Sequence, residues 1–406
     1  MKILYICDKL IKFILNEIID LNRNNEIFIL SEHSEKAYEV INKPILIEND
    51  LDRKYHKFIS FKNRKDKYFY FFAKILYDFI VHPICAYRAV INILKHYPNP
   101  KYGISDYLDA RYFFDSEIDV IHSPFSTPSI IDKTFLLSKI LNVPFTLSFR
   151  AHDIYEGDNS LEIQKRIRKI REASQIMTIS DYNKKNLEKA FNINKNIEVI
   201  HSSIDPDFFK PTNLTRSQKS IVTVCRLHEQ KGLIYLISAC NILHKRNIDY
   251  TCTIIGEGSE KQKYEKLIDD LQIPNIIFIN NLPYNEIKNH LNYYTVFVLP
   301  CIIAHDGKRD ILANSLKEAM AMEIPVITSN ICGIEELVDD GINGFLVHPQ
   351  DPEAIANAIE KVFNTPDLGS KVGKEARKKI RKDFNIKVEA EKLEKIFKEI
   401  ELHSRN

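Results

Sequence analysis

Two cations and two carboxylates in the second half of the chain raise the question of whether a ligand-binding site lies there. Arg226 and Lys231 lie five residues apart in "CRLHEQKGL", directly after a strand-like run. Asp310 precedes a helical pattern that contains Glu318, in "RDILANSLKEAM". Arginine and lysine can bracket a diphosphate, and carboxylates accept hydrogen bonds from hydroxyl groups. Taken singly, a basic loop or a helix glutamate is more often a solvated surface group.

The helix that follows Asp310 would add a further anion-binding feature. Asn314 or Ser315 is expected to cap it, and Leu316, Ala319 and Met320 form its core stripe. Unpaired amides at such a helix start favour an anionic group. Glu318 lies off this stripe and, on the pattern alone, faces water.

Two glycines form a third element of the pattern. Gly256 and Gly258 in "IIGEGS" follow a strand and precede a helix. Here a backbone can approach a ligand closely, although the same residues also suit a simple tight turn.

The elements that must position these groups alternate between strand and helix. Short β-branched runs recur from Lys2 to Ile179 and again from Ile221 to Val347, with helical patterns between most of them. A run at 44–48, "PILIE", is among the expected strands, and "GIEEL" at 333–337 starts an expected helix. The polar stretch 201–220 separates the two series. This alternation predicts an α/β fold with two doubly wound parallel sheets, which bind ligands at the carboxyl ends of their strands.

Composition sets the broad class of the protein. The chain has 406 residues, 44% hydrophobic and 28% charged, with a net charge of +2, which suits two globular domains and favours no class of partner. Seven cysteines, an odd number in mostly apolar runs, are expected to be reduced and buried. Asp8 and Lys9 interrupt the first apolar run, so no signal peptide is expected. The nearest candidate for a membrane span, residues 68–87, is broken by Lys74, Asp78 and His82, so no span is expected either.

The order of the motifs carries more information than any one of them. "VCRLHEQKG", "IIGEGS", "FVLPC" and "RDILANSLKEAMAMEIPVITSN" follow one another as in glycosyltransferase family 4, the retaining enzymes with the GT-B double-Rossmann architecture. The chain resembles the capsular and exopolysaccharide members of that family. The resemblance is dense over residues 221–362 and thinner in the first half, through "DVIHSPF" and "FRAHDIY". It implies domains at 1–205 and 206–383 around a central cleft, and a C-terminal helix at 384–406 that packs back on the first domain.

The resemblance also assigns roles to individual residues. His152 of "FRAHDIY" would reach the donor sugar, Arg226 and Lys231 would hold the donor diphosphate, Asp310 would lie by the sugar, and Glu318 would bind the ribose hydroxyls. Without the resemblance, a lone histidine after a strand is more often structural. The implied donor-binding residues are Gly256, Gly258, Asn280, Ile311, Asn314, Ser315 and Leu316.

The reaction implied by the resemblance is hexose transfer from a UDP- or GDP-linked sugar to a glycan or lipid-linked saccharide, in polysaccharide biosynthesis. Two cations and a helix start can stabilise the diphosphate leaving group, so neither a metal nor another cofactor is expected. Attack on the same face of the sugar gives retention, and no covalent nucleophile is nominated. The protein is expected in the cytoplasm, or on the inner face of the membrane.

The sequence departs from the family pattern at several places. Asp310 stands for the usual glutamate, Ile311 replaces the following glycine, and Glu323 replaces another glycine. Glu17, in "FILNEI", is either an acceptor-side carboxylate or a helix-surface glutamate. These changes leave open a catalytically silent relative that binds sugar nucleotides or glycans as a partner subunit. A GT-B enzyme of another type, such as an epimerase, fits the motif order less well.

Residues 51–100 have an unusual composition. They contain ten Lys and Arg against three Asp and Glu, together with twelve Phe and Tyr. Two interpretations remain: a membrane surface formed by residues 53–97, or a helix pair whose aromatic side chains form a core. Nucleic-acid binding is not expected, because no RNA-binding motif accompanies the basic residues.

Overall fold

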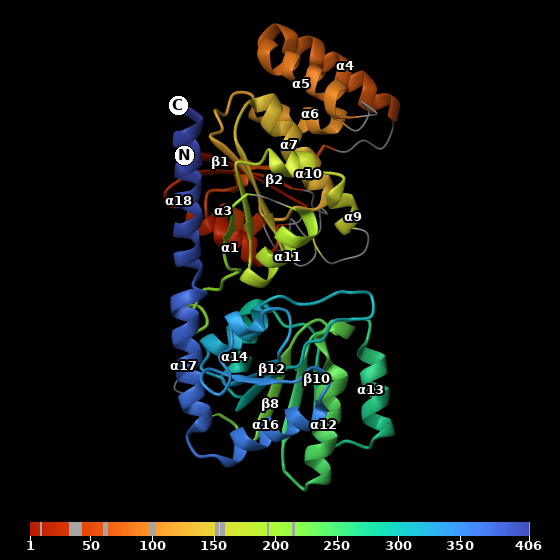
Figure 1. The fold of residues 1–406 in the computed structure, drawn as a ribbon, viewed down its shortest axis with the longest axis vertical. Coiled ribbons are helices and arrows are strands. Elements are labelled where there is room, and N and C mark those ends of the chain that lie inside the picture. Colours follow the sequence, from red (N-terminus) through yellow and green to blue (C-terminus); the bar gives the residue numbers. More distant parts are fainter. Residues whose placement is uncertain are drawn as a thin grey trace.

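Two parallel β-sheets with helices on both faces form the two lobes of the molecule (Figure 1). The computed structural model describes residues 1–8, 10–31, 43–59, 64–97, 103–150, 154, 159–192, 195–212 and 216–405. The prediction of two doubly wound domains is confirmed.

The first sheet has seven strands in the order β3-β2-β1-β4-β5-β6-β7. Along β1, Leu4 and Ile6 lie in one core while Ile3 and Tyr5 lie in another, as expected for a strand that is buried on both faces. The strands are β1 (Lys2–Cys7), β2 (Glu26–Ser31), β3 (Tyr55–Lys57), β4 (Val120–Ser123), β5 (Phe145–Phe149), β6 (Gln175–Thr178) and β7 (Ile197–Val199). The helices are α1 (Lys12–Leu21), α3 (Lys43–Glu48), η2 (Asp52–Lys54), α4 (Arg64–Val81), α5 (Pro83–His96), α6 (Gly103–Ala110), η3 (Arg111–Phe113), α7 (Pro128–Leu141), α9 (Asn159–Gln164), α10 (Ile167–Arg171) and α11 (Asp181–Phe191).

The second sheet has six strands in the order β10-β9-β8-β11-β12-β13. Its two faces again carry separate cores, with Phe297 and Leu299 on one side and Val296 and Val298 on the other. The strands are β8 (Ser220–Val224), β9 (Thr251–Ile255), β10 (Ile276–Ile279), β11 (Val296–Leu299), β12 (Val326–Ser329) and β13 (Phe345–Val347). The helices are η4 (Glu229–Lys231), α12 (Leu233–Lys245), α13 (Lys261–Asp270), α14 (Tyr284–Leu291), α15 (Asn314–Ala321), η5 (Ile334–Glu336), α16 (Pro352–Asn364), α17 (Leu368–Asp383) and α18 (Ile386–Arg405).

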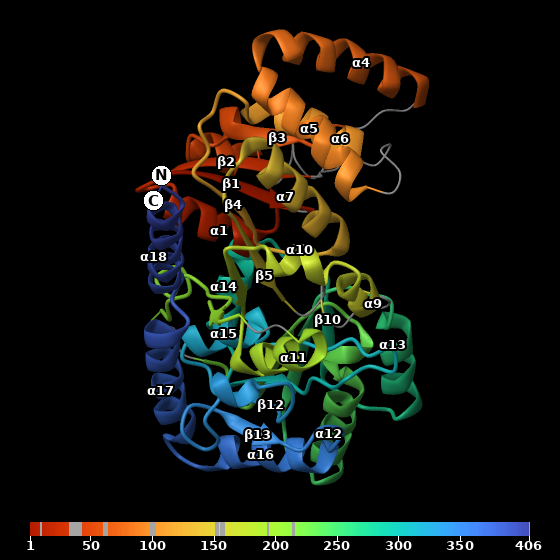
Figure 2. The ribbon, with the colours of Figure 1, turned by 45° about the horizontal axis from the view of Figure 1, so that its top comes forward.

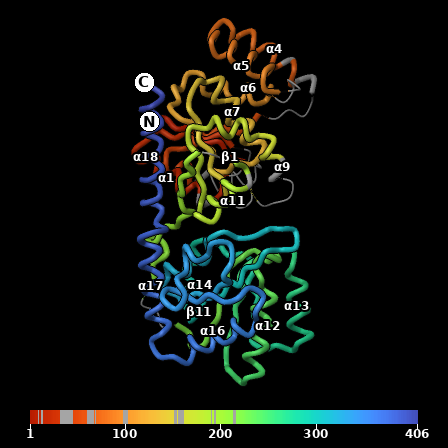
Figure 3. Tube along the Cα trace, in the orientation of Figure 1, coloured from red at the N-terminus to blue at the C-terminus, as the bar shows by residue number. Residues whose placement is uncertain are grey.

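The chain crosses between the lobes twice, at neighbouring points. Ile204 leads into the second domain and Asn385 leads out of it, and the two form an isolated parallel bridge. Its hydrogen bonds run from the Ile204 amide to the Phe384 carbonyl, 3.1 Å, and from the Ile386 amide to the Ile204 carbonyl, 3.0 Å. Helices α17 and α18 then run along one side of both lobes (Figure 3), and α18 packs against α1.

Two predicted elements are wrong. "PILIE" lies in helix α3 rather than in a strand, and the segment after Gly333 forms the single 3-10 turn η5 rather than a helix. A short apolar run satisfies either period, and proline is compatible with the first turn of a helix. At η5, the Glu336 carboxylate accepts a hydrogen bond from the Tyr182 amide of the first domain, and Leu337 ends the turn.

Candidate functional site

The Lys231–Asp310 ion pair lies where two loops leave the carboxyl ends of strands β8 and β11. Lys231 ends η4, and its Nζ lies 2.8 Å from Oδ1 of Asp310. Burial lowers the pKa of Lys231, but the Asp310 carboxylate outweighs this effect, so the pKa lies above its ordinary value. The ammonium is therefore fully charged at neutral pH.

Arg226 lies on the same loop and is exposed, with no ion pair to any residue in the described ranges. The loop reaches α12 through Gly232, whose φ of 66° is left-handed and whose missing side chain leaves room for the Pro300 carbonyl. A Cβ at this position would lie 1.9 Å from that carbonyl oxygen. Gly232 thus fixes the position of Lys231 relative to the loop after β11.

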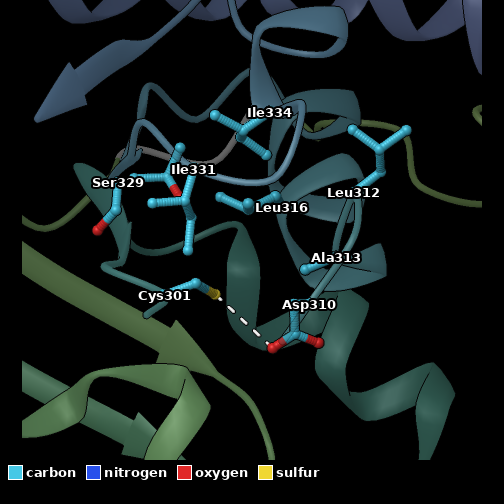
Figure 4. Close-up of a pocket in the computed structure, with 9 residues that line it drawn as sticks. Cys301, Asp310, Leu312, Ala313, Leu316, Ser329, Ile331 and Ile334 are labelled. Atoms are coloured by element: carbon cyan, nitrogen blue, oxygen red, sulfur yellow. Dashed lines mark hydrogen bonds between the residues drawn. The ribbon is translucent and has the colours of Figure 1, made fainter. Parts of the chain in front are cut away.

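Asp310 borders a small pocket at the ends of β11 and β12. Figure 4 shows its carboxylate pointing toward Cys301, whose Sγ lies 3.8 Å from Oδ2. The pocket has a volume of about 10 Å³, room for about one water molecule. Ile311 and Leu312 are buried in the adjoining core, and Leu312 has a left-handed φ of 51°. The side chain of Ile311 therefore lies in the protein interior.

The start of α15 differs in detail from the prediction. Ala313 occupies the N-cap, so neither Asn314 nor Ser315 caps the helix, and no side chain among the described residues bonds to its first amides at the cap. The Asn314 Oδ1 instead accepts a hydrogen bond of 3.3 Å from the Ser202 hydroxyl. Leu316 is buried and lines the pocket. The helix start retains unpaired amides beside Asp310.

Glu318 is buried, which corrects the expectation that it faces water. Burial raises the pKa of Glu318 to about 7, although Lys317 and the Tyr284 hydroxyl act in the opposite direction. Tyr284 begins α14, and its ring stacks on Phe208 at 5.2 Å. Glu318 is thus a buried carboxyl, and among the described residues it contacts Tyr284 rather than the Lys231–Asp310 pair.

The predicted glycines face protein rather than open space. A Cβ on Gly256 would lie 1.9 Å from the Cys225 carbonyl oxygen, and one on Gly258 would lie 2.3 Å from that of Leu227. The Leu227 amide also bonds to the Glu257 carbonyl at 2.8 Å. Both glycines therefore let the β9–α13 loop pack against the loop that carries Arg226.

Asn280 lies just beyond β10, where its Oδ1 accepts a hydrogen bond of 3.0 Å from Lys261. Both residues are on the strand-end side of the sheet, but Asn280 is exposed and makes no contact with Lys231 or Asp310 among the contacts of the described chain.

The two predicted residues of the first domain have different outcomes. His152 lies outside the described residues. Glu17 is buried, which corrects its interpretation as a helix-surface residue. Its carboxylate accepts a 3.0 Å hydrogen bond from Tyr5 and lies 3.7 Å from Arg150. Burial raises the pKa of Glu17, and Arg150 opposes this rise.

The site side of the second domain contacts the first domain. Glu336 accepts backbone hydrogen bonds of 2.9 Å each from Asp181 and Tyr182, at the start of α11. Lys317 is fully buried and donates to the Ser202 carbonyl. Burial lowers the pKa of Lys317 to about 7. The strand ends that carry Lys231 and Asp310 thus face the lobe that carries Glu17.

Sequence reasoning missed Tyr284, Lys317 and Arg150. Each is a polar residue whose importance depends on a partner more than thirty residues away. Lys317 lies within "RDILANSLKEAM" and Arg150 within "FRAHDIY", but neither motif shows what these side chains contact, and Tyr284 lies outside the motifs. Only burial distinguishes Lys317 from the other lysines, and no local pattern encodes it. Within the described ranges, no group of three His, Cys, Asp or Glu side chains is placed to hold a metal ion.

A family model described as glycosyl transferases group 1 matches residues 205–379, the segment that contains Arg226, Lys231, Asp310 and Glu318. These residues form a group 1 glycosyl transferase domain. The predicted resemblance to enzymes of capsular and exopolysaccharide type is confirmed by curated relatives that match about half of the chain.

Two curated relatives illustrate what this chain is similar to. The putative colanic acid biosynthesis glycosyltransferase WcaL of Escherichia coli is 31% identical over 54% of this chain and 55% of that protein. The amylovoran biosynthesis glycosyltransferase AmsK of Erwinia amylovora is 30% identical over 50% of this chain and 51% of that protein. The chain thus spans about half the length of the curated relatives that it matches.

Solved structures match the whole fold. A glycosyltransferase from Rickettsia africae superposes with a TM-score of 0.73 over 98% of each chain, at 20% identity. Anabaena HepE, solved in complex with UDP, superposes with a TM-score of 0.69 over 98% of this chain and 100% of that chain, at 16% identity. At these identities the likeness establishes the fold, which is GT-B.

Proposed function

We propose that the protein is a retaining glycosyltransferase of polysaccharide biosynthesis. It moves a hexose from a nucleotide diphosphate sugar, UDP- or GDP-linked, to a glycan or lipid-linked saccharide on the cytoplasmic side of the membrane. The observation that carries this proposal is the charged Lys231–Asp310 pair beside the unpaired start of α15, within a group 1 glycosyl transferase domain. The complexes of Anabaena HepE with UDP and with UDP-glucose support a donor of this class.

The diphosphate is the leaving group, and its negative charge grows as the bond to the sugar breaks. Lys231 has a permanent charge, and Asp310 holds its ammonium in one place, so little reorganisation is needed when that charge develops. Arg226 is exposed on the same loop and can turn its planar guanidinium onto a second phosphate. These two cations, with the first amides of α15, supply the positive charge without a divalent metal.

The two carboxyl groups serve the rest of the donor. Glu318 accepts hydrogen bonds from the ribose hydroxyls, and its buried position favours binding over solvation. Asp310 has one oxygen on Lys231 and its other oxygen 3.8 Å from the Cys301 Sγ, and in this proposal its carboxylate accepts from a sugar hydroxyl.

Donor binding and turnover test the proposal directly. A cognate donor among UDP-, GDP- and ADP-sugars should raise Tm, because a ligand that binds only the folded state stabilises it by mass action. Lys231→Ala should abolish both this rise and sugar transfer, by at least a hundredfold in kcat/KM, since a charge-assisted contact to the leaving group is lost. Transfer should continue in the presence of EDTA.

Lys379→Ala is the matched control, because Lys379 is also partly buried and paired with a carboxylate, Asp383 at 3.2 Å, on α17. It should retain donor binding and transfer. A donor that binds tightly without turnover would identify a sugar-nucleotide-binding subunit instead. The absence of a Tm shift with every nucleotide sugar would contradict the proposal.

A further inference from the structure

One face of the hairpin formed by α4 and α5 packs against the rest of the first domain. On that inner face Ile75 and Ala86 are buried, and Asp78 is fully buried in an ion pair with Arg111. The Arg111 Nη2 lies 2.8 Å from Oδ1 of Asp78, and the Tyr107 hydroxyl also donates to this carboxylate. The hairpin therefore contributes one face to the core of the first domain, and this core does not account for the whole of its apolar composition.

The outer face of α4 is apolar and exposed. Phe72, Leu76 and Ile80 lie four residues apart, so they form one stripe along the helix. Ile80 is 82% exposed and Leu76 is 67% exposed. A stripe of this kind on a surface helix normally faces a core, and here it faces outward.

The stripe continues along α5. Ile84, Tyr87, Ile91 and Leu94 recur at intervals of three and four residues, and all four are exposed. Figures 1 and 2 both show the hairpin at the end of the first domain, away from the second domain. A contiguous apolar surface of this extent marks an interaction site.

The charges on this hairpin are strongly unbalanced. Between residues 64 and 97 the acidic residues are Asp66 and Asp78, and Asp78 is already neutralised by Arg111. The basic residues are Arg64, Lys65, Lys67, Lys74, Arg88 and Lys95. An exposed apolar stripe on a segment with this excess of basic residues matches a partner that is apolar inside and anionic at its boundary.

A second copy of the chain fits this face poorly. A two-fold contact would bring the same patch of each copy together, and with it the same excess of positive charge. A lipid surface with anionic headgroups has the opposite charge, and exposed tyrosines such as Tyr87 suit its boundary region. No helix in the described part of the chain is long and apolar enough to span a bilayer, so the hairpin would lie on it.

We propose that the outer face of the α4–α5 hairpin binds an anionic lipid bilayer, with Phe72, Leu76, Ile80, Ile84, Tyr87 and Leu94 in the boundary between headgroups and acyl chains. The inference does not depend on the glycosyltransferase activity. If both hold, the first domain is positioned to receive a lipid-linked acceptor.

Sedimentation of the full chain with vesicles tests this inference without any nucleotide sugar. The protein should bind vesicles that contain phosphatidylglycerol at least tenfold more tightly than vesicles of phosphatidylcholine alone. Binding should weaken in about 1 M salt, where the Debye length falls to about 3 Å. Ile80→Glu/Ile84→Glu should reduce vesicle binding at least tenfold and leave Tm unchanged, because both side chains are exposed.

Ile277→Glu/Ile342→Glu is the matched control, since these isoleucines are 54% and 61% exposed in the second domain. This variant should bind vesicles like the unmodified protein. The inference is overturned if the unmodified protein fails to bind anionic vesicles, or if the hairpin variant binds them equally well. A dimer that the hairpin variant converts to a monomer, without vesicle binding, would assign the face to a second copy. Equal binding to uncharged vesicles would overturn the role of the basic residues.

Discussion

At residue 318, burial changes what a carboxyl group contributes to the protein. The pKa of Glu318 is raised by burial from 4.5 to about 7, so the folded state holds this proton more tightly than the unfolded chain does. Between pH 4.5 and about 7, folding stability therefore falls as pH rises, and above pH 7 the full cost remains. A ligand whose hydroxyl groups donate to the carboxylate would offset this cost.

Glu318→Gln should therefore stabilise the protein while it removes donor binding. Above pH 7 we expect a gain of about 1–3 kcal/mol in the free energy of unfolding, and no gain near pH 4.5. Urea unfolding at several pH values measures this difference. Glu188 lies at an exposed position of α11, where its carboxylate is solvated. Glu188→Gln removes the same charge from this position and should change neither stability nor binding. A loss of stability in Glu318→Gln at high pH would show that the carboxylate is structurally required.

The residue types at the site could be predicted from the sequence, but their burial could not. Lys231 and Asp310 are 79 residues apart, and only the fold shows that they touch. Glu318 and Glu17 both resemble surface glutamates on their helical patterns, because local periodicity does not report what a neighbouring domain covers. The motif order located the site, and the structure determined its contacts.

At the scale of the elements, the connection between η4 and α12 determines where Lys231 lies. Gly232→Ala should cost about 2 kcal/mol or more in stability, because its Cβ would collide with the Pro300 carbonyl in addition to the strain of a positive φ. The same change should weaken donor binding, since Lys231 is the preceding residue. Chemical denaturation and donor titration measure both effects.

Gly341→Ala separates the effect of a positive φ from the effect of the collision with Pro300. Gly341 has a φ of 71°, close to that of Gly232, but a Cβ there would meet nothing within 4 Å. This control should cost only about 1 kcal/mol, from backbone strain alone, with donor binding unchanged. Equal losses in the two variants would show that the contact with Pro300 is unimportant.

The strands could be predicted better than the short helical elements. Buried parallel strands such as β8 and β11 are nearly continuous apolar runs, which few other structures share. The six residues of α3 contain too little sequence to distinguish a strand from a helix, and η5 is limited by a contact with α11 that lies far away in the chain. Errors therefore fall where the tertiary contacts decide the local conformation.

At the scale of the whole molecule, His201 links the two lobes beside their crossing point. Its Nε2 lies 3.7 Å from Glu336 of the second domain, and its Nδ1 lies 3.8 Å from Glu389 of α18. Burial lowers the pKa of His201, but these two carboxylates outweigh burial and raise it above 6.5. The stability from this contact is thus fully present below about pH 6.5 and is lost as pH rises through the raised pKa.

His201→Gln should remove this pH dependence. The unmodified protein should lose about 1 kcal/mol of stability as the pH rises from 6.5 through the raised pKa of His201. The variant should start lower and show a flatter profile over the same range. Thermal unfolding across this range measures both slopes, with His244→Gln on the exposed side of α12 as the control. Identical profiles in the unmodified protein and His201→Gln would exclude the histidine as the source.

The bridge between Ile204 and Asn385 limits how the two lobes can move. Two separate tethers at distant points would hold the lobes rigid, and a single tether would let one lobe tumble against the other. Because the two crossings are joined side by side, one low-energy motion of the lobes remains, which is a rotation of one lobe against the other about an axis through the bridge. The amplitude of that rotation grows with distance from α17, so it is largest near α13 on the opposite side of the second domain (Figure 1). A pair of spectroscopic labels on α13 and α9 would therefore detect donor-driven closure with the greatest change in distance.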